Sequence, residues 1–317
     1  MNTEYLLPLD IDLEEGSMIY TLATERDLHD KLKLSVREFP LDQLREVDMR
    51  GVGQWAAGLG VAPPMSFLFH LPFCGSTLLS HFLVAAGWCV LRDPAIIAAT
   101  FQTDRSSAVS LRPLVTQLLS HAFGDRPKII RTAGYHPSVM TRLHEHMPRA
   151  RKLFVYADPE FFMLQVLKDP RRREDLRLLA AEVAHGQQDG GHDRAPPDSD
   201  ADCAIDFWIA SARQALAIGD PLGTVNAAQL MERQPATFAA VQSHFGGKSH
   251  GVDTWLAGLT QHAKTGACFD AGQQRKQLSQ HRELDHEAVE GALRRFRSCG
   301  GEALWAALRS RDITDAT

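Results

Sequence analysis

The residues best suited to bind an anion lie between positions 70 and 79. An apolar run, Phe67-Leu68-Phe69, leads into a turn that contains Gly75, and Ser76 and Thr77 then open a second apolar run. Backbone N–H groups at the start of a helix, aided by the helix dipole, bind negatively charged groups. Ser76 and Thr77 would add hydroxyl donors, and Gly75 would let a ligand approach the backbone closely. The pattern predicts a phosphate-binding loop, and a tight strand-to-helix turn with a Ser/Thr N-cap is the alternative.

The loop lacks the signatures of the commonest nucleotide sites. No Lys precedes the hydroxyl pair, as a Walker A loop requires, and G-x-G-x-x-G is absent. Cys74 would lie at a helix N-terminus, where the pKa of a thiol falls, although packing as a small buried residue is the favoured interpretation. The five cysteines fit no zinc spacing, so no metal site is predicted.

Three other polar side chains follow predicted strands, where ligands collect in parallel sheets. Arg131 ends the predicted strand 128–131 and would face an anion bound at the loop. His70 and His136 follow two predicted strands and are candidate bases for taking a proton from a hydroxyl. For each histidine, a hydrogen-bonded structural role is the alternative.

The elements that must position these residues alternate between strand and helix. The predicted strands are 67–69, 88–91, 128–131, 153–156 and 222–225. The predicted helices are 41–59, 76–86, 94–100, 111–123, 137–146, 159–168, 205–218, 287–296 and 302–309. This alternation predicts an α/β three-layer sandwich with a mainly parallel sheet.

Residues 1–60 carry short β-like runs, such as 18–22 and 32–36, and are predicted to form an α+β N-terminal extension. Residues 61–317 would form the α/β domain. Within it, residues 186–202 are polar and rich in Gly, Pro and Asp, which predicts a mobile insertion.

Composition excludes several classes of function. The chain has 317 residues, 44% of them hydrophobic, and a net charge of −5, which argues against a bulk nucleic-acid binder. The apolar stretch 66–91 is interrupted by His70, Pro72 and Gly75, which argues against a membrane span. The odd number of cysteines and the absence of a basic N-terminal segment favour a cytoplasmic location.

The loop 72–79, P-F-C-G-S-T-L-L, resembles the P-R/K-S-G-S/T-T-x-L loop of the sulfotransferases that use 3′-phosphoadenosine-5′-phosphosulfate (PAPS). The segments around Asp93, Arg131 and Asp158 follow in the family's order, so the resemblance spans roughly residues 64–298. It implies a P-loop NTPase-like fold, PAPS as cofactor and Asp93 as the base. The cofactor-binding residues that it implies are Phe73, Cys74, Gly75, Ser76, Thr77, Leu78 and Lys264.

The sequence departs from this family at three functional positions. Phe73 replaces the basic residue of the loop, Ala157 replaces an Arg that binds the 3′-phosphate, and Gln165 lies near the position of a Ser. Arg131, Lys264 or the basic run 168–173 could replace the missing charges. For the basic run, a solvated charged turn is the alternative, and for Lys264 an exposed loop lysine.

The resemblance predicts transfer of a sulfuryl group to a hydroxyl or amine of a small-molecule acceptor. The departures keep two alternatives open. One is a non-catalytic module of the same fold that binds a nucleotide or a protein, and the other is a P-loop enzyme, such as a kinase, with another phosphorylated ligand. A homodimer or a partner enzyme fits either alternative, whereas nucleic acid and membrane are not expected partners.

Overall fold

The computed structural model describes residues 4–30, 34–133, 137–186, 197–220, 222–232, 234–247, 252, 255–256 and 271–314. The chain divides into two compact units. Unit 1 consists of Met1–Leu68, Ser80–Thr132 and Arg142–Lys152. Unit 2 consists of Phe69–Leu79, Ala133–Thr141 and Leu153–Thr317. The domain boundary predicted at residue 60 stays a prediction.

A five-stranded sheet has the order β5-β6-β4-β7-β8. Its strands are β4 (Met65–His70), β5 (Cys89–Arg92), β6 (Lys128–Ala133), β7 (Lys152–Tyr156) and β8 (Leu222–Asn226). Strands β5 and β6 pair in parallel from Cys89↔Lys128 to Arg92↔Arg131. Every residue of β5 and β7 is buried, as expected for strands covered on both faces. The predicted α/β class with a parallel sheet flanked by helices is therefore confirmed.

Unit 1 also contains an antiparallel sheet of order β1-β2-β3, formed by β1 (Tyr5–Asp12), β2 (Ser17–Ala23) and β3 (Arg45–Asp48). Strand β1 packs against α4 (Ala95–Phe101) and α5 (Ser106–His121). The remaining elements of this part are the helices α1 (Glu25–Asp30) and α2 (Met49–Ala57) and the 3-10 turns Val36–Glu38 and Leu41–Gln43.

Two sequence predictions in this region are wrong. Residues 45–48 pair with β2 instead of continuing a helix over 41–59, and the side chain of Asp48 accepts a hydrogen bond from the backbone N–H of Arg50. An Asp in this N-cap position starts the helix at Met49. The β-like run at 32–36 ends in a 3-10 turn at Val36–Glu38, and residues 31–33 lie outside the described residues.

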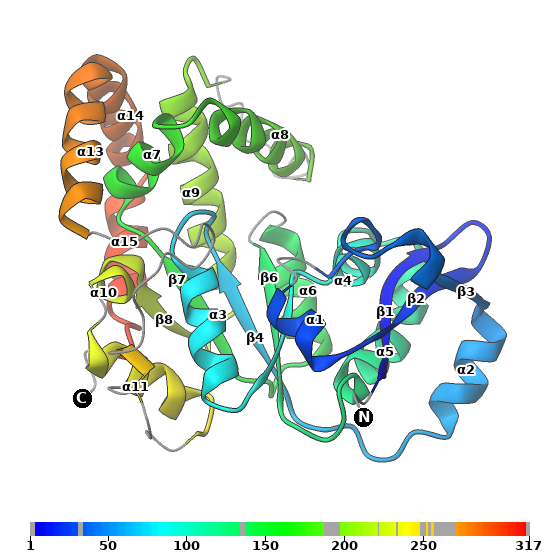
Figure 1. The fold of residues 1–317 in the computed structure, drawn as a ribbon. Coiled ribbons are helices and arrows are strands. Elements are labelled where there is room, and N and C mark those ends of the chain that lie inside the picture. The colour runs from blue at the N-terminus through cyan, green and yellow to red at the C-terminus, as the bar shows by residue number, and fades with distance from the viewer. Residues whose placement is uncertain are drawn as a thin grey trace. The chain divides into compact units, whose positions relative to one another are not determined.

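In unit 2, helix α9 (Asp200–Ala217) packs against α7, α8, α14 and α15 (Figure 1). Trp208 of α9 is fully buried, and its Nε1–H donates to the backbone oxygen of Ala157 at 2.8 Å. The other helices are α7 (Pro159–Leu167), α8 (Pro170–Gly186), α10 (Ala227–Met231), α11 (Pro235–His244), α13 (Ala271–Leu284), α14 (His286–Ser298) and α15 (Gly301–Arg309).

The predicted insertion 186–202 is too long at both ends. Gly186 is the last residue of α8, and Ser199 caps α9 by accepting a hydrogen bond from the N–H of Asp202 at 3.1 Å. Residues 187–196 lie outside the described residues. The basic run 168–173 is also not a turn, because α8 begins at Pro170, where proline is favoured in the first helical turn.

Strands β6 and β7 each begin with a buried lysine. The Nζ of Lys128 in β6 donates to the backbone oxygens of Gly124 and Arg126. The Nζ of Lys152 in β7 donates to the oxygens of Met147 and Ala150 at 2.9 and 2.8 Å. Burial lowers the pKa of Lys152 to about 8. Each lysine thus satisfies carbonyls of the turn that leads into its strand.

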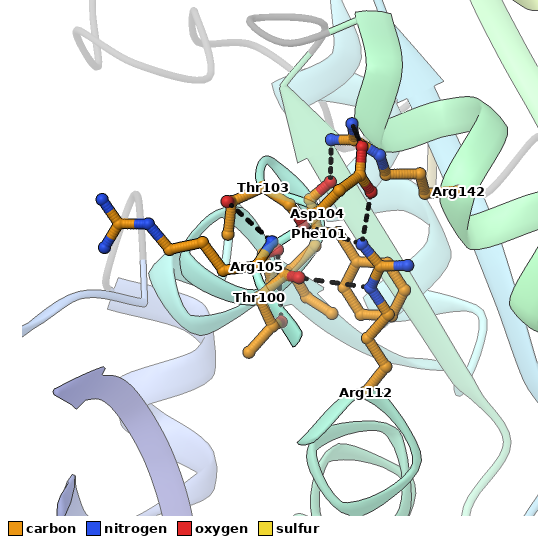
Figure 2. Close-up of polar contacts among 8 residues, drawn as sticks. Thr100, Phe101, Thr103, Asp104, Arg105, Arg112 and Arg142 are labelled. Atoms are coloured by element: carbon orange, nitrogen blue, oxygen red, sulfur yellow. Dashed lines mark hydrogen bonds and ion pairs between the residues drawn. The ribbon is translucent and has the colours of Figure 1, made fainter. Parts of the chain in front are cut away.

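A polar network in unit 1 joins the end of α4 to α5 and to Arg142, in the middle of α6 (Pro137–His146) (Figure 2). Arg112 donates to the backbone oxygens of Thr100 and Thr103, and its guanidinium lies 5.2 Å from the centre of the Phe101 ring. Asp104 pairs with both Arg112 and Arg142. The network fixes the end of α4, the helix that directly follows Asp93 and Pro94.

Candidate functional site

The predicted strand-turn-helix unit around Gly75 is present, and its turn lies in the Phe69–Leu79 segment of unit 2. Strand β4 ends at His70, and helix α3 (Ser76–Ala85) begins directly after Gly75. The oxygen of Gly75 accepts the first helical hydrogen bond, from Leu79 N–H at 3.1 Å. The first turn of α3 therefore begins at Ser76, ahead of this hydrogen bond. Ser76 and Thr77 are both buried in this turn.

Two residues of the loop have left-handed backbone conformations. Gly75 has φ +83°, which glycine adopts without steric cost. Phe73 has φ +60°, a conformation in which a bulky side chain costs about 1–3 kcal/mol. Such strain persists only where surrounding contacts hold it, and the contact that Phe73 makes is specific.

That contact is with Arg172 of α8. The centre of the Arg172 guanidinium lies 4.4 Å from the centre of the Phe73 ring, a short cation–π distance. Nη1 of Arg172 donates to the backbone oxygen of Gln165 at 2.9 Å and to its Oε1 at 3.0 Å. Nε lies 3.7 Å from Asp169 Oδ2. A positive charge is thereby held against the loop residue that replaces a basic one.

The other two departures from the sequence pattern, Gln165 and Ala157, are both buried in unit 2. Gln165 is 2% exposed, and its Nε2 has no hydrogen-bond partner in the described part of the chain. Ala157 is 1% exposed, and its oxygen accepts the Trp208 indole N–H. Burial, and then the charge of Arg172, lower the pKa of Lys168 to about 8. At the junction of α7 and α8, the cation Arg172 thus lies beside the neutral Gln165 amide and acts on the charge of Lys168.

Asp93 and Arg131 form an ion pair within unit 1. Their side chains are 11% and 5% exposed, and the backbone N–H of Asp93 also donates to the oxygen of Arg131 at 2.7 Å. Asp93 has φ +45°. Leu34 holds this turn on both sides, because its N–H donates to Arg92 O at 2.8 Å and its oxygen accepts from Ala95 N–H at 3.0 Å. The pairing partly balances the charge that Arg131 would offer to an anion.

The remaining predicted site residues are placed as follows. His70 is 5% exposed, and its Nδ1 lies 2.9 Å from the oxygen of Leu71. Cys74 is fully buried, as its packing interpretation expects, and Leu78 is half-buried. His136 and Lys264 lie outside the described residues. The structure brings Asp93 to Arg131, and the loop residue Phe73 to Arg172, while the catalytic roles of these residues stay predictions.

Sequence reasoning singled out neither Arg172 among its basic neighbours nor Leu34. Arg172 follows Gln165 by seven residues across a short break between two helices, which brings them together. Arg171, one position earlier, is exposed. The only sequence signal for Arg172 is that Asp158 and Pro170 mark the starts of two consecutive helices, since Asp158 caps α7. The contact with Phe73 is tertiary and has no local signal.

Two general searches of the described residues give negative results. No group of three or more His, Cys, Asp or Glu side chains is placed to hold a metal ion there. Among the described residues there is also no helix that is long and apolar enough to span a membrane.

Neither a protein-family model nor a curated protein sequence matches the chain. Solved structures similar to it include a sulfotransferase domain from the curacin biosynthetic pathway, with 11% identity and a TM-score of 0.38 over 59% of this chain and 75% of that one. They also include a sulfotransferase from Alicyclobacillus acidocaldarius, with 12% identity and a TM-score of 0.38 over 73% of this chain and 96% of that one. The evidence for function within this chain is the loop and the residues around it.

Proposed function

We propose that this protein is a sulfotransferase-like enzyme that binds PAPS at the loop 71–78 and transfers its sulfuryl group to a small-molecule hydroxyl or amine. The observation that carries the proposal is the loop itself. A buried strand runs through a glycine turn into a helix that begins Ser-Thr, and a guanidinium lies against the turn. Such a unit suits a phosphate group.

The residues present fit an anionic cofactor. The first-turn N–H groups of α3 are donors suited to a phosphate, and Gly75, which has no side chain, leaves the backbone open to close approach. The buried Gln165 amide also has a donor without a partner in the described part of the chain, which a ligand oxygen would satisfy. When bound, PAPS supplies an activated sulfuryl group.

In the reaction, the bond between sulfur and the bridging oxygen of the phosphosulfate breaks, and a bond from sulfur to the acceptor oxygen or nitrogen forms. The acceptor proton must pass to a base, for which His70, Asp93 and His136 are the candidates. The negative charge that is left on the phosphate oxygens must be stabilised, a task for the α3 N–H groups and for a nearby cation. Arg131 is a candidate for the charge at the sulfuryl group.

The first test is calorimetric titration of the full chain with 3′,5′-adenosine bisphosphate, beside ATP, GTP and AMP. Micromolar binding of the bisphosphate alone is expected, followed by acceptor screening with PAPS. The Ser76→Ala/Thr77→Ala double variant should lose binding while its unfolding temperature stays close to that of the wild type. A folded double variant that binds the bisphosphate as the wild type does would refute the assignment of the loop.

A non-catalytic nucleotide-binding module is the second candidate. The observation that favours it is the ion pair between Arg131 and Asp93, which occupies two proposed catalytic groups with each other. The two candidates differ in turnover. Binding of the bisphosphate without sulfuryl transfer to any acceptor supports the module, whereas transfer that the Arg131→Ala variant abolishes supports the enzyme.

We also propose a cytoplasmic location. In support, none of Cys74, Cys89, Cys203 and Cys299 forms a disulfide, and burial raises the pKa of Cys89 to about 11, which keeps that thiol protonated. Alkylation of the protein from intact cells under native and unfolding conditions tests this, with reduced thiols as the expected result.

A further inference from the structure

The proposed loop has no basic residue of its own. From Leu71 to Leu78 the sequence reads L-P-F-C-G-S-T-L, so the charge of a bound phosphate group would be met there by dipoles and hydroxyls only. Phosphate sites commonly add a cation to such a loop. A site that binds a polyanion tightly therefore needs a positive charge from elsewhere in the fold.

Arg172 is held where it can supply this charge. Its guanidinium lies 4.4 Å from the centre of the Phe73 ring, and both hydrogen bonds of Nη1 go to Gln165. Nη2 makes no hydrogen bond with any residue in the described part of the chain, and the side chain is 27% exposed. The planar guanidinium is thus fixed through Nη1, while Nη2 is available to donate to an anion.

We infer that Arg172 is the cation of the loop, acting from helix α8 in place of a basic residue at position 73. The inference rests on the proposed function, because it assumes that the loop binds an anion. Phe73 then has a definite task. Its ring is the platform that keeps the guanidinium beside the loop, which explains why a phenylalanine is retained in a left-handed conformation.

The charges around Arg172 support this role. Burial lowers the pKa values of both Arg172 and Lys168, and each of the two receives a partial counter-charge from Asp169. Two half-buried cations that share one carboxylate leave excess positive charge near the loop. Gln165, at 2% exposure, adds an amide Nε2 that has no partner among the described residues. An anion bound beside Arg172 would balance part of this excess charge.

A purely structural role is the competing explanation. Arg172 would then only tie α8 to the end of α7 through Gln165, and its nearness to Phe73 would be incidental. The two explanations differ in what Phe73→Lys does. Only if Arg172 is the cation of the loop should a lysine at position 73 replace it.

The test measures affinity by calorimetry, at constant ionic strength, for 3′,5′-adenosine bisphosphate and for inorganic pyrophosphate. Arg172→Ala should weaken the binding of both probes about ten- to a hundredfold, the effect of losing one charge-assisted contact. Arg171→Ala, which removes the same charge from an exposed neighbour, should change either affinity less than twofold. Phe73→Lys added to Arg172→Ala should recover at least tenfold of the lost affinity.

Unfolding temperatures separate binding from folding. If the alanine variant is unfolded, Arg172→Gln removes the charge while it keeps a donor for Gln165, and the same loss of affinity is expected. A folded Arg172 variant that binds like the wild type would overturn the inference and leave the proposed function standing. So would a Phe73→Lys change that rescues nothing.

Failure of the proposed function looks different. Wild-type protein that binds pyrophosphate but not the bisphosphate would reject PAPS as cofactor, while the pyrophosphate series would still decide the role of Arg172. Wild-type protein that binds neither probe would overturn both the proposed function and the inference.

Discussion

Lys168 is the residue whose ionisation should report most directly on anion binding at the loop. Burial and the charge of Arg172 lower its pKa to about 8, from a usual value of 10.5. At pH 8 about half of the Lys168 side chains are therefore uncharged in the free protein. A bound polyanion favours the charged form, so binding at pH 8 should take up about half a proton from solution.

The same shift fixes the pH dependence of affinity. Below about pH 7 Lys168 is almost fully charged, so its ionisation no longer changes the affinity. If binding returns its pKa to about 10.5, the affinity falls roughly thirtyfold between pH 7 and pH 9.5. The affinity decreases with rising pH because the pKa of Lys168 is higher in the complex. The complex keeps a proton that the free protein loses as the pH rises.

Proton uptake is measured by calorimetry at pH 8 in two buffers with different heats of ionisation. Lys168→Met keeps the length of the apolar stem and removes the titrating group, so it is the matched control. The difference in uptake between the wild type and this variant isolates Lys168 from the phosphate groups and the histidines. Equal uptake in the two proteins, with clear binding by both, would refute a role for Lys168.

Three other changes test separate parts of the structure. Arg112→Ala removes the hydrogen bonds that this side chain, which is 12% exposed, donates to the backbone oxygens of Thr100 and Thr103. The free energy of unfolding, measured by denaturant titration, should therefore fall by about 1–3 kcal/mol. The control Arg105→Ala, at an exposed position, should change it little. Gly75→Ala forces a side chain into φ +83° and should cost about 1–2 kcal/mol of stability and weaken bisphosphate binding, with unchanged binding counting against the loop geometry. Between pH 8 and 10.5 the unfolded chain holds more protons at Lys152 than the folded chain does, so the wild type should become more stable as the pH rises. Relative to Lys152→Met, its free energy of unfolding should increase by up to about 3 kcal/mol over this range. Parallel pH profiles of the two proteins would contradict the lowered pKa.

The sequence predicts the alternation of the fold well because most of its signals are local. The helix predicted at 137–146 has the bounds of α6, and Asn226, the short polar residue before α10, accepts a hydrogen bond from Ala228 N–H at 2.9 Å. Proline at the first helical position and a short polar cap are the local signals behind such boundaries. The glycine turn at residue 75 is predicted for the same reason, since only local geometry is required.

The errors occur where tertiary contacts decide. Residues 45–48 have a loosely helical pattern, yet pairing with β2 makes them a strand. The charged segment after residue 168 is helical because one face of α8 packs against α7 and α9, and Leu176 on that helix is buried. A sequence rich in Arg and Asp shows little of this face, because so few of its residues are apolar.

The same limit applies to the candidate site. In the motif, Phe73 stands where a basic residue is expected, which indicates the loss of a positive charge. A motif, however, describes only the order of residues along the chain. An anion responds to where the charge lies in space. Arg172, 99 positions further along the chain, lies over the ring of that phenylalanine. The replacement at position 73 and the arginine on α8 are then two halves of one arrangement, so Phe73 alone is no evidence of inactivity. Phe73→Leu removes the ring and keeps Arg172, so it should weaken anion binding. It does so without changing the charge of the protein, because leucine and phenylalanine are both neutral.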